Sequence, residues 1–309
     1  MRGWPLRPTP TDIRRACCAP TERGPRESSA AYLLGHLRAG DRLLDVGCGP
    51  ATITLGLAAS VAPGEVVAVD GAPAAIEAAA ATVGAAEAAG EIEPEQIVVR
   101  VADAYALPFE DGSFDVVHAH QVLQHLARPV EALAEWRRVC RPGGIVAVRD
   151  ADYAAMTWWP AMPELDRWLA LYRAAASANG GEPDAGRRLL SWALAAGFDP
   201  ERIQPSAGSW CYATPPERAR WAGTWAERIT GTTLAEQLVE RAMATQEELA
   251  AIGAAWRRWA EQPDAWFIVP NGELDLPLLT LPQRGESSVE ELSADLLGDV
   301  DPEVGSQAE

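Results

Sequence analysis

Near its amino end the chain reads Leu43-Leu44-Asp45-Val46-Gly47-Cys48-Gly49-Pro50-Ala51-Thr52, and this run indicates the fold class. Its first four residues are typical of a short buried strand, and an Ala-rich helical pattern begins at Ala51. The glycines between them let the backbone approach a ligand closely, where the amino end of the helix offers free N–H groups. The run therefore predicts a strand, a ligand-binding turn and a helix in succession.

Around this run, short β-branched segments alternate with Ala-rich helical ones, which is the pattern of βαβ units and a mostly parallel sheet. Pro73 and Pro129 occupy the first turn of two of the helical segments, where proline is tolerated. We expect strands at 42–46, 65–70, 96–101, 114–118 and 144–150, and helices at 51–60, 73–89 and 129–139.

From Ala151 onward longer helical patterns dominate, and ten of the twelve Trp lie there. These helices can form a cap over an apolar cleft, or the Trp can simply pack the cap onto the body. We expect helices at 163–178, 186–196, 216–229 and 245–261, and strand-like runs at 203–213 and 266–269.

Both ends of the chain have the composition of disordered tails. Residues 1–26 are rich in Arg and Pro, and residues 275–309 carry nine acids against a single Arg. We therefore divide the chain into an N-terminal tail (1–26), a ligand-binding core (27–150), a helical cap that completes the sheet edge (151–274) and an acidic tail (275–309).

Composition excludes several classes of function. The 309 residues carry a formal net charge of -18, which repels nucleic acid and anionic membranes. Every cation is Arg, so Lys-based chemistry is excluded. We find no apolar run long enough for a membrane span and no signal peptide, and expect a cytoplasmic protein. The five cysteines form no CxxC pair, so we expect neither disulfides nor a metal site.

The acids near the glycine turn indicate the chemical class of the ligand. Asp70 closes the second expected strand, where a carboxylate can accept both hydroxyls of a ribose. The third glycine of a dinucleotide fingerprint is missing, and Asp45 would repel a diphosphate but can receive an ammonium group. These residues favour a nucleoside that carries an amino acid over a nicotinamide dinucleotide.

Four segments in this order resemble the motif series of class I S-adenosylmethionine-dependent methyltransferases, of the small-molecule type that includes the ubiquinone and menaquinone methyltransferases. They are LLDVGCGPATITLGLA, VVAVDGA, VVRVADAYALPFEDGSFDVVHAHQVLQHL and LAEWRRVCRPGGIVAVRD. The resemblance implies a Rossmann-like, mostly parallel seven-stranded sheet with helices on both faces, here with a helical, Trp-rich cap. The chain departs from the family pattern at two places. Ala51 stands where many members have a third glycine, and an acidic segment replaces the expected last strand after Leu274.

The same resemblance implies the contacts to S-adenosylmethionine. The glycine turn and Asp45 would hold the methionine part, Asp70 the ribose, and Asp103 with the backbone of Ala104 the adenine. The cofactor-binding residues expected on this basis are Tyr32, Asp45, Gly47, Cys48, Gly49, Asp70, Gly71, Asp103, Ala104, His120 and Gln121.

Methyl transfer depends mainly on alignment, and a base is needed only for a hydroxyl or a protonated amine. Three of the four His lie within eight residues. We expect His118 to be structural and bonded to the backbone, and His120 to contact the cofactor or act in catalysis. His125 either caps a turn or faces the acceptor.

Further candidates follow the fifth strand and lie in the cap. Asp152 and Tyr153 can orient or deprotonate an acceptor, or can serve turn and packing roles. Arg187 can hold a carboxylate of the acceptor or form a surface ion pair. The aromatic candidates for acceptor contact are Trp158, Trp159 and Trp210.

The leading hypothesis is an S-adenosylmethionine-dependent methyltransferase with a small, aromatic or polycyclic acceptor. The alternative is a protein that binds the same cofactor without methyl transfer, as a cyclase or a ligand-binding regulator. The Arg-, Ala- and Gly-rich composition is typical of GC-rich genomes, where such enzymes often serve secondary metabolism. We expect a monomer or homodimer that binds neither nucleic acid nor membranes.

Overall fold

The computed structural model of the protein describes residues 29–279. They contain an eight-stranded sheet with the order β3-β2-β1-β4-β5-β8-β6, in which β7 also pairs with β8. The predicted α/β class and mostly parallel sheet are confirmed, with eight strands in place of seven. The strands are β1 (Leu43–Val46), β2 (Val66–Asp70), β3 (Ile97–Val101), β4 (Phe114–His120), β5 (Cys140–Ala151), β6 (Thr157–Trp159), β7 (Gln204–Tyr212) and β8 (Trp266–Pro277).

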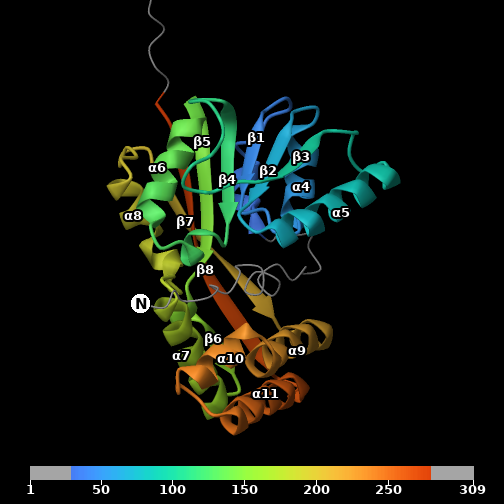
Figure 1. Ribbon diagram of the computed structural model, residues 1–309, viewed down its shortest axis with the longest axis vertical. Helices are drawn as coiled ribbons and strands as arrows, with labels where there is room; N and C mark the ends of the chain where they lie inside the picture. The colour runs from blue at the N-terminus through green and yellow to red at the C-terminus, as the bar shows by residue number, and fades with distance from the viewer. Residues whose placement is uncertain (1–28, 280–309) are drawn as a thin grey trace, which may run out of the picture. The chain divides into compact units, whose positions relative to one another are not determined.

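Helices cover both faces of this sheet (Figure 1). One face packs against α3 (Ala31–Leu34), α4 (Thr52–Val61) and α5 (Pro73–Ala89). The other packs against α6 (Pro129–Val139) and α8 (Leu189–Ala195). Short 3-10 turns lie at η1 (Leu123–His125), η2 (Tyr153–Ala155) and η3 (Ala185–Arg188).

Local signals explain where the core helices begin and end. Pro73 and Pro129 stand at the first turns of α5 and α6, as predicted. Gly90 ends α5 in the left-handed region at φ 69°, and its N–H bonds the carbonyls of Ala86 and Glu87. The buried residues of α5 are Ala75, Ala79, Val83 and Ala86, at the three- and four-residue spacing of one helix face.

Strand β8 is longer than the sequence pattern indicated. It continues past Val269 to Pro277 and pairs antiparallel with β5, from Ala151 opposite Asn271 to Ile145 opposite Pro277. This corrects two expectations, the loss of the last strand after Leu274 and a tail that begins at residue 275. The strand tolerates its acids because they alternate with Leu274 and Leu276, which are buried on the apolar face. Residues 280–309 of that predicted tail, and residues 1–26, lie outside the described residues.

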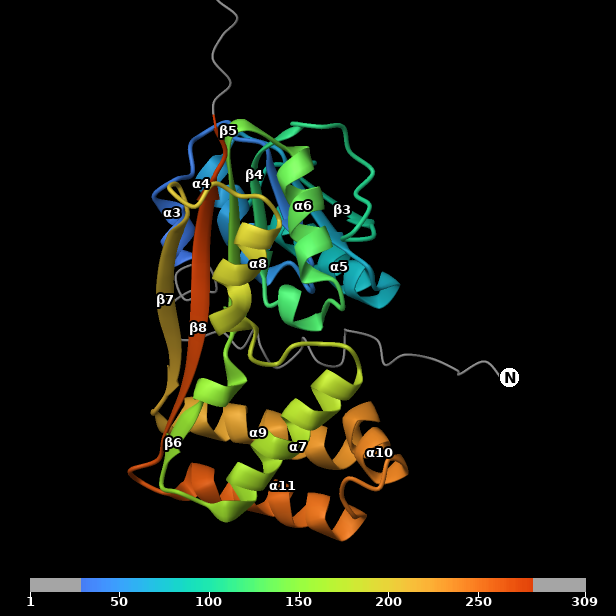
Figure 2. The same ribbon diagram turned by 90° about the vertical axis from the view of Figure 1, so that its left-hand side faces the viewer.

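The cap consists of α7 (Pro163–Ala178), α9 (Pro215–Gly231), α10 (Thr233–Glu240) and α11 (Gln246–Glu261). Figure 2 shows β7 and β8 running from the sheet toward these helices. Helix α9 begins with a capping box, in which the side chains of Thr214 and Glu217 bond each other's backbone N–H groups. The sequence pattern predicted α7, α9 and α11 but neither α10 nor β6.

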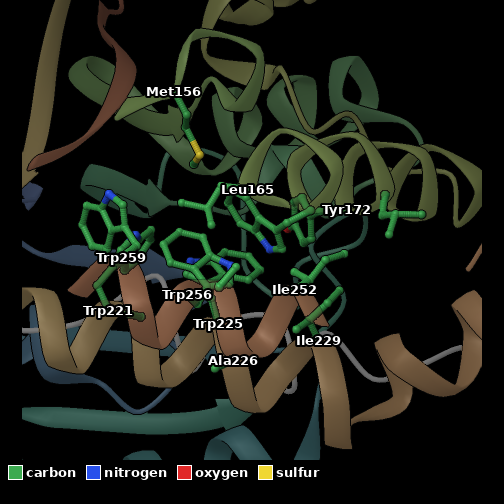
Figure 3. Close-up of a cluster of buried hydrophobic side chains, with 14 of the residues drawn as sticks. Met156, Leu165, Tyr172, Trp221, Trp225, Ala226, Ile229, Ile252, Trp256 and Trp259 are labelled. Atoms are coloured by element: carbon green, nitrogen blue, oxygen red, sulfur yellow. The ribbon is translucent and has the colours of Figure 1, made fainter. Parts of the chain in front are cut away.

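Aromatic packing forms the core of the cap (Figure 3). Trp256 is fully buried, and its ring centroid lies 4.8 Å from that of Trp168 and 5.5 Å from that of Phe267. Most of these ring pairs are edge-to-face, the arrangement that aromatic quadrupoles favour. The interpretation that Trp residues pack the cap therefore applies to this cluster. In residues 29–279, none of the helices is long and apolar enough to cross a membrane.

We predict that Trp256→Ala lowers the free energy of unfolding by about 3–5 kcal/mol, because it opens a cavity in this aromatic cluster. Trp266 is 49% exposed, so Trp266→Ala is the matched control and should change stability by less than about 1 kcal/mol. Urea denaturation followed by circular dichroism measures both. Equal losses for the two variants would contradict a cap built on buried Trp.

Candidate functional site

A pocket opens where β1 and β4 end at the carboxyl edge of the sheet. The residues that line it are Asp45, Gly47, Cys48, Gly49, Pro50, Thr52, Ile53, His118, His120 and Gln121. The structure thus brings together most of the predicted contacts to the methionine part of the cofactor.

The glycine turn forms the floor of this pocket. Gly47 and Gly49 have φ angles of 72° and 54°, which L side chains rarely adopt. A Cβ added to Gly49 would meet no atom within 4 Å, so the bare backbone there borders open space. The N–H groups of Gly47 and Cys48 both bond the carbonyl of Val69. Ala51 takes the left-handed conformation too, at φ 62°, so the departure from the family's third glycine leaves the turn intact.

Asp45 is anchored beneath the turn. It is 3% exposed, and its Oδ2 accepts the hydroxyl of Thr54 at 2.5 Å. Its Oδ1 lies 2.8 Å from Nδ1 of His118, which corrects the expected backbone partner of that histidine. A carboxylate has about four acceptor sites. Asp45 therefore keeps capacity for a ligand that enters the pocket.

Asp70 connects the turn to the next helix. It is 2% exposed and accepts the N–H of Gly49 at 3.2 Å and that of Ala72 at 3.0 Å. Gly71 follows it and is exposed. These contacts place the predicted ribose acid beside the pocket, at the carboxyl end of β2.

The predicted adenine contacts follow β3. Asp103 is exposed, and its Oδ1 accepts the N–H of Tyr105 at 3.0 Å. The carbonyl of Ala104 accepts the indole N–H of Trp136 at 3.0 Å, which fixes the loop against α6. Both residues lie at the same edge of the sheet as Asp70, but neither lines the pocket.

His120 is a titratable group of the pocket. It is 7% exposed, and among the described residues neither ring nitrogen has a hydrogen-bond partner. Burial, reinforced by the nearby charge of Arg149 and then by His118, holds the pKa of His120 well below its usual range. The imidazole is therefore neutral at neutral pH and can accept a proton or a hydrogen bond. The ring of Trp210 lies beside it, with the centroids 5.4 Å apart.

Gln121, which has a positive φ of 57°, bonds polar side chains from two elements, β8 and η1. Its amide donates to Oδ1 of Asn271 at 3.0 Å and accepts from Nε2 of Gln124 at 2.6 Å. Gln124 in turn lies 3.1 Å from Nε2 of His125. His125 is thus part of a side-chain network after β4, outside the pocket lining.

The structure does not bring the other predicted residues to the pocket. Arg187 and Asp152 form a two-pronged ion pair with distances of 2.6 and 2.7 Å, which fits the surface-pair interpretation of Arg187. Tyr153 stacks on Tyr172 in the cap core. The aromatics Trp158 and Trp159 lie toward the end of β8 that enters the cap, the first stacked on Phe267 and the second 58% exposed.

Sequence reasoning missed three polar residues near the site, the buried Arg149 and Asn271 and the partly buried Glu273. Arg149 was read only as the end of a strand, and the other two lie in the part of β8 that was not predicted. Asn271, Glu273 and Asp275 alternate with Gly272, Leu274 and Leu276. That period of two is a strand signal and could have revealed them.

Comparison with known proteins indicates the family. Residues 44–148 match the family model described as a methyltransferase domain. An uncharacterized methyltransferase of Schizosaccharomyces pombe is 34% identical over 248 residues, 80% of this chain and 88% of that protein. The probable methyltransferase ltbC of Aspergillus luteorubrus is 32% identical over 260 residues, 78% of this chain and 87% of that protein. The crystal structure of the YcgJ protein of Bacillus subtilis, at 18% identity, has a TM-score of 0.52 and covers 80% of this chain and 97% of its own, which shows a shared fold.

We predict that Thr54→Val lowers the free energy of unfolding by about 1.5–3 kcal/mol, because a hydrogen bond to the buried Asp45 carboxylate is lost. Thr82 instead bonds a neutral acceptor, the backbone carbonyl of Ala78 within helix α5, so Thr82→Val serves as the control. Chemical denaturation of both variants gives the comparison. A Thr54→Val protein as stable as the control would contradict the anchoring role of Asp45.

The low pKa of His120 also predicts a pH dependence of stability. The unfolded state takes up a proton near pH 6.5 and the folded state only at lower pH, so His120 reduces stability as pH falls below about 6.5. Burial raises the pKa of Asp275 to about 6, which acts in the opposite direction, so wild type must be compared with His120→Gln. Between pH 7.5 and 5 the wild type should lose stability relative to the variant, by at most about 1.4 kcal/mol per pH unit. Parallel stability curves over that range would contradict the buried neutral histidine.

Proposed function

Because the chain belongs to the class I S-adenosylmethionine-dependent methyltransferases, we propose that it binds S-adenosylmethionine over the glycine turn and methylates a small planar acceptor beside Trp210. The observation that carries this proposal is His120, a buried neutral imidazole with no partner among the described residues, which lines the same pocket as the turn. Its place at the carboxyl end of β4 is where ligands bind in open α/β sheets.

The residues of the pocket fit the cofactor. The bare backbone at Gly49 gives close approach, and the remaining acceptor sites of Asp45 suit an ammonium group. Asp70, at the carboxyl end of β2, would accept the ribose hydroxyls, and Asp103 with Ala104 lies farther along the same edge, where the family resemblance puts the adenine. The bound cofactor supplies a methyl group on a sulfonium, which is transferred by in-line displacement.

The protein's own contribution to the chemistry is to position the acceptor and to handle its proton. A neutral imidazole can take the proton of an acceptor hydroxyl as the methyl group is transferred. The indole of Trp210, which is 5% exposed, lies next to that imidazole. This pairing favours a planar acceptor with an oxygen or nitrogen nucleophile, of the kind found in secondary metabolism.

Cofactor binding is tested by calorimetry with S-adenosylhomocysteine. We expect Asp70→Asn to weaken binding by about tenfold or more, because hydrogen bonds from the ribose to a carboxylate are replaced by bonds to a neutral amide. Glu77→Gln, an exposed acid on α5, should leave the affinity unchanged.

Methyl transfer is then followed with S-adenosylmethionine labelled in its methyl group and an organic cell extract as the source of acceptors. His120→Gln should reduce transfer about 100-fold or more while cofactor affinity is retained. Cofactor binding without label in any extracted compound would favour the cyclase or regulator instead.

A further inference from the structure

A row of polar side chains crosses one face of the sheet beyond the pocket. The strand register places His120 opposite Arg149, and Arg149 opposite Glu273. The side chains of Arg149 and Glu273 are 1% and 11% exposed. On the opposite face the same strands bury apolar residues such as Val148 and Leu274. Charged groups held out of water in this way need partners.

Arg149 is only partly satisfied by the protein. Its Nε donates to Oε1 of Glu273 at 2.9 Å, but Nη1 is buried and has no hydrogen-bond partner among the described residues. Gly208 leaves room for this pair, since a Cβ there would clash with Oε1 of Glu273 and lie 3.5 Å from Nη2 of Arg149. A buried donor without a partner is unfavourable, so this nitrogen is suited to a ligand oxygen.

Trp210 joins Arg149 to the pocket. Its ring lies 4.8 Å from the guanidinium carbon of Arg149, and 5.4 Å from the ring centroid of His120. Three unpartnered nitrogens, Nη1 of Arg149 and both ring nitrogens of His120, therefore gather around one indole. A flat acceptor beside Trp210 would present its edge to these nitrogens.

We propose that Arg149 recognises the acceptor, through a hydrogen bond from Nη1 to a neutral carbonyl or hydroxyl oxygen on a planar ring. The inference rests on the proposed function, and it names the class of acceptor. A carboxylate is disfavoured because the charge of Arg149 is already matched by Glu273, so a further negative charge would meet that acid at close range. The acceptor class is thus a neutral, planar, oxygenated ring compound.

The test compares two bicyclic probes that differ in one oxygen, the ketone α-tetralone and the hydrocarbon tetralin, titrated against the full chain by calorimetry. The wild type should bind α-tetralone about tenfold or more tighter than tetralin, since a hydrogen bond from a charged donor distinguishes them. Arg149→Lys keeps a positive charge for Glu273 but lacks the second planar nitrogen, so it should bring the ratio of affinities close to one. Arg141→Lys, an exposed position on the same strand, should keep the wild-type ratio.

A purely structural role of Arg149 would weaken both probes alike and leave their ratio unchanged. If Arg149→Lys does not fold, the double variant Arg149→Gln with Glu273→Gln replaces the ion pair by two neutral amides and serves the same comparison. Equal affinities of the wild type for the two probes, no measurable binding of either, or an unchanged ratio in the variants would overturn the proposal.

The two proposals can fail separately. Methyl transfer by the wild type with no Arg149-dependent preference between the probes would reject the recognition role alone. The preference without cofactor binding or methyl transfer would reject the proposed function and leave a site for neutral ring oxygens.

Discussion

The antiparallel pairing of β8 with β5 is the constraint on which the rest of the structure depends. Through it, Leu274 and Leu276 complete the apolar face that packs on α6 and α8, while Asn271 and Glu273 join the polar face. β6 and β7 both pair with β8, so the cap is tied to the core along the same strand. One strand therefore connects the cap to the core and also contributes two of the polar groups around the site.

The polar groups at the glycine turn and those near Trp210 differ in whether the protein itself satisfies their hydrogen bonds. At the glycine turn, Asp45 and Asp70 already have hydrogen-bond partners in the protein, so their positions are fixed before any ligand arrives. Near Trp210, His120 and Arg149 keep nitrogens without partners in the described part of the chain. Preorganised groups favour binding because little reordering is needed, and unsatisfied donors favour a ligand that supplies the missing acceptor. The geometry thus suits a constant cofactor at one end and a selected acceptor at the other.

Sequence predicted the parts of the fold that rest on local signals. Local sequence signals mark where each of these elements begins or ends. The elements are the glycine turn, the five core strands, and the helices that begin at Pro73 and Pro129. What it could not predict depends on partners far along the chain. Arg149 and Glu273 are 124 residues apart, and His118 is 73 residues from Asp45. Closeness in sequence to β5 also gave a wrong position for Trp158 and Trp159, which were expected at the acceptor. They belong to β6, which pairs with the cap end of β8.

Charge acts on this site at two length scales. The net charge of -18 creates a field that disfavours the approach of anionic compounds, but salt screens it beyond about 8 Å at physiological ionic strength. Inside the site, Arg149 is matched by Glu273, so the local balance is close to neutral, and burial removes the screening. Long-range charge can therefore influence which molecules arrive, whereas the hydrogen bond that Arg149 still lacks decides which of them is held beside Trp210. A neutral ring oxygen satisfies both conditions, and a carboxylate satisfies neither.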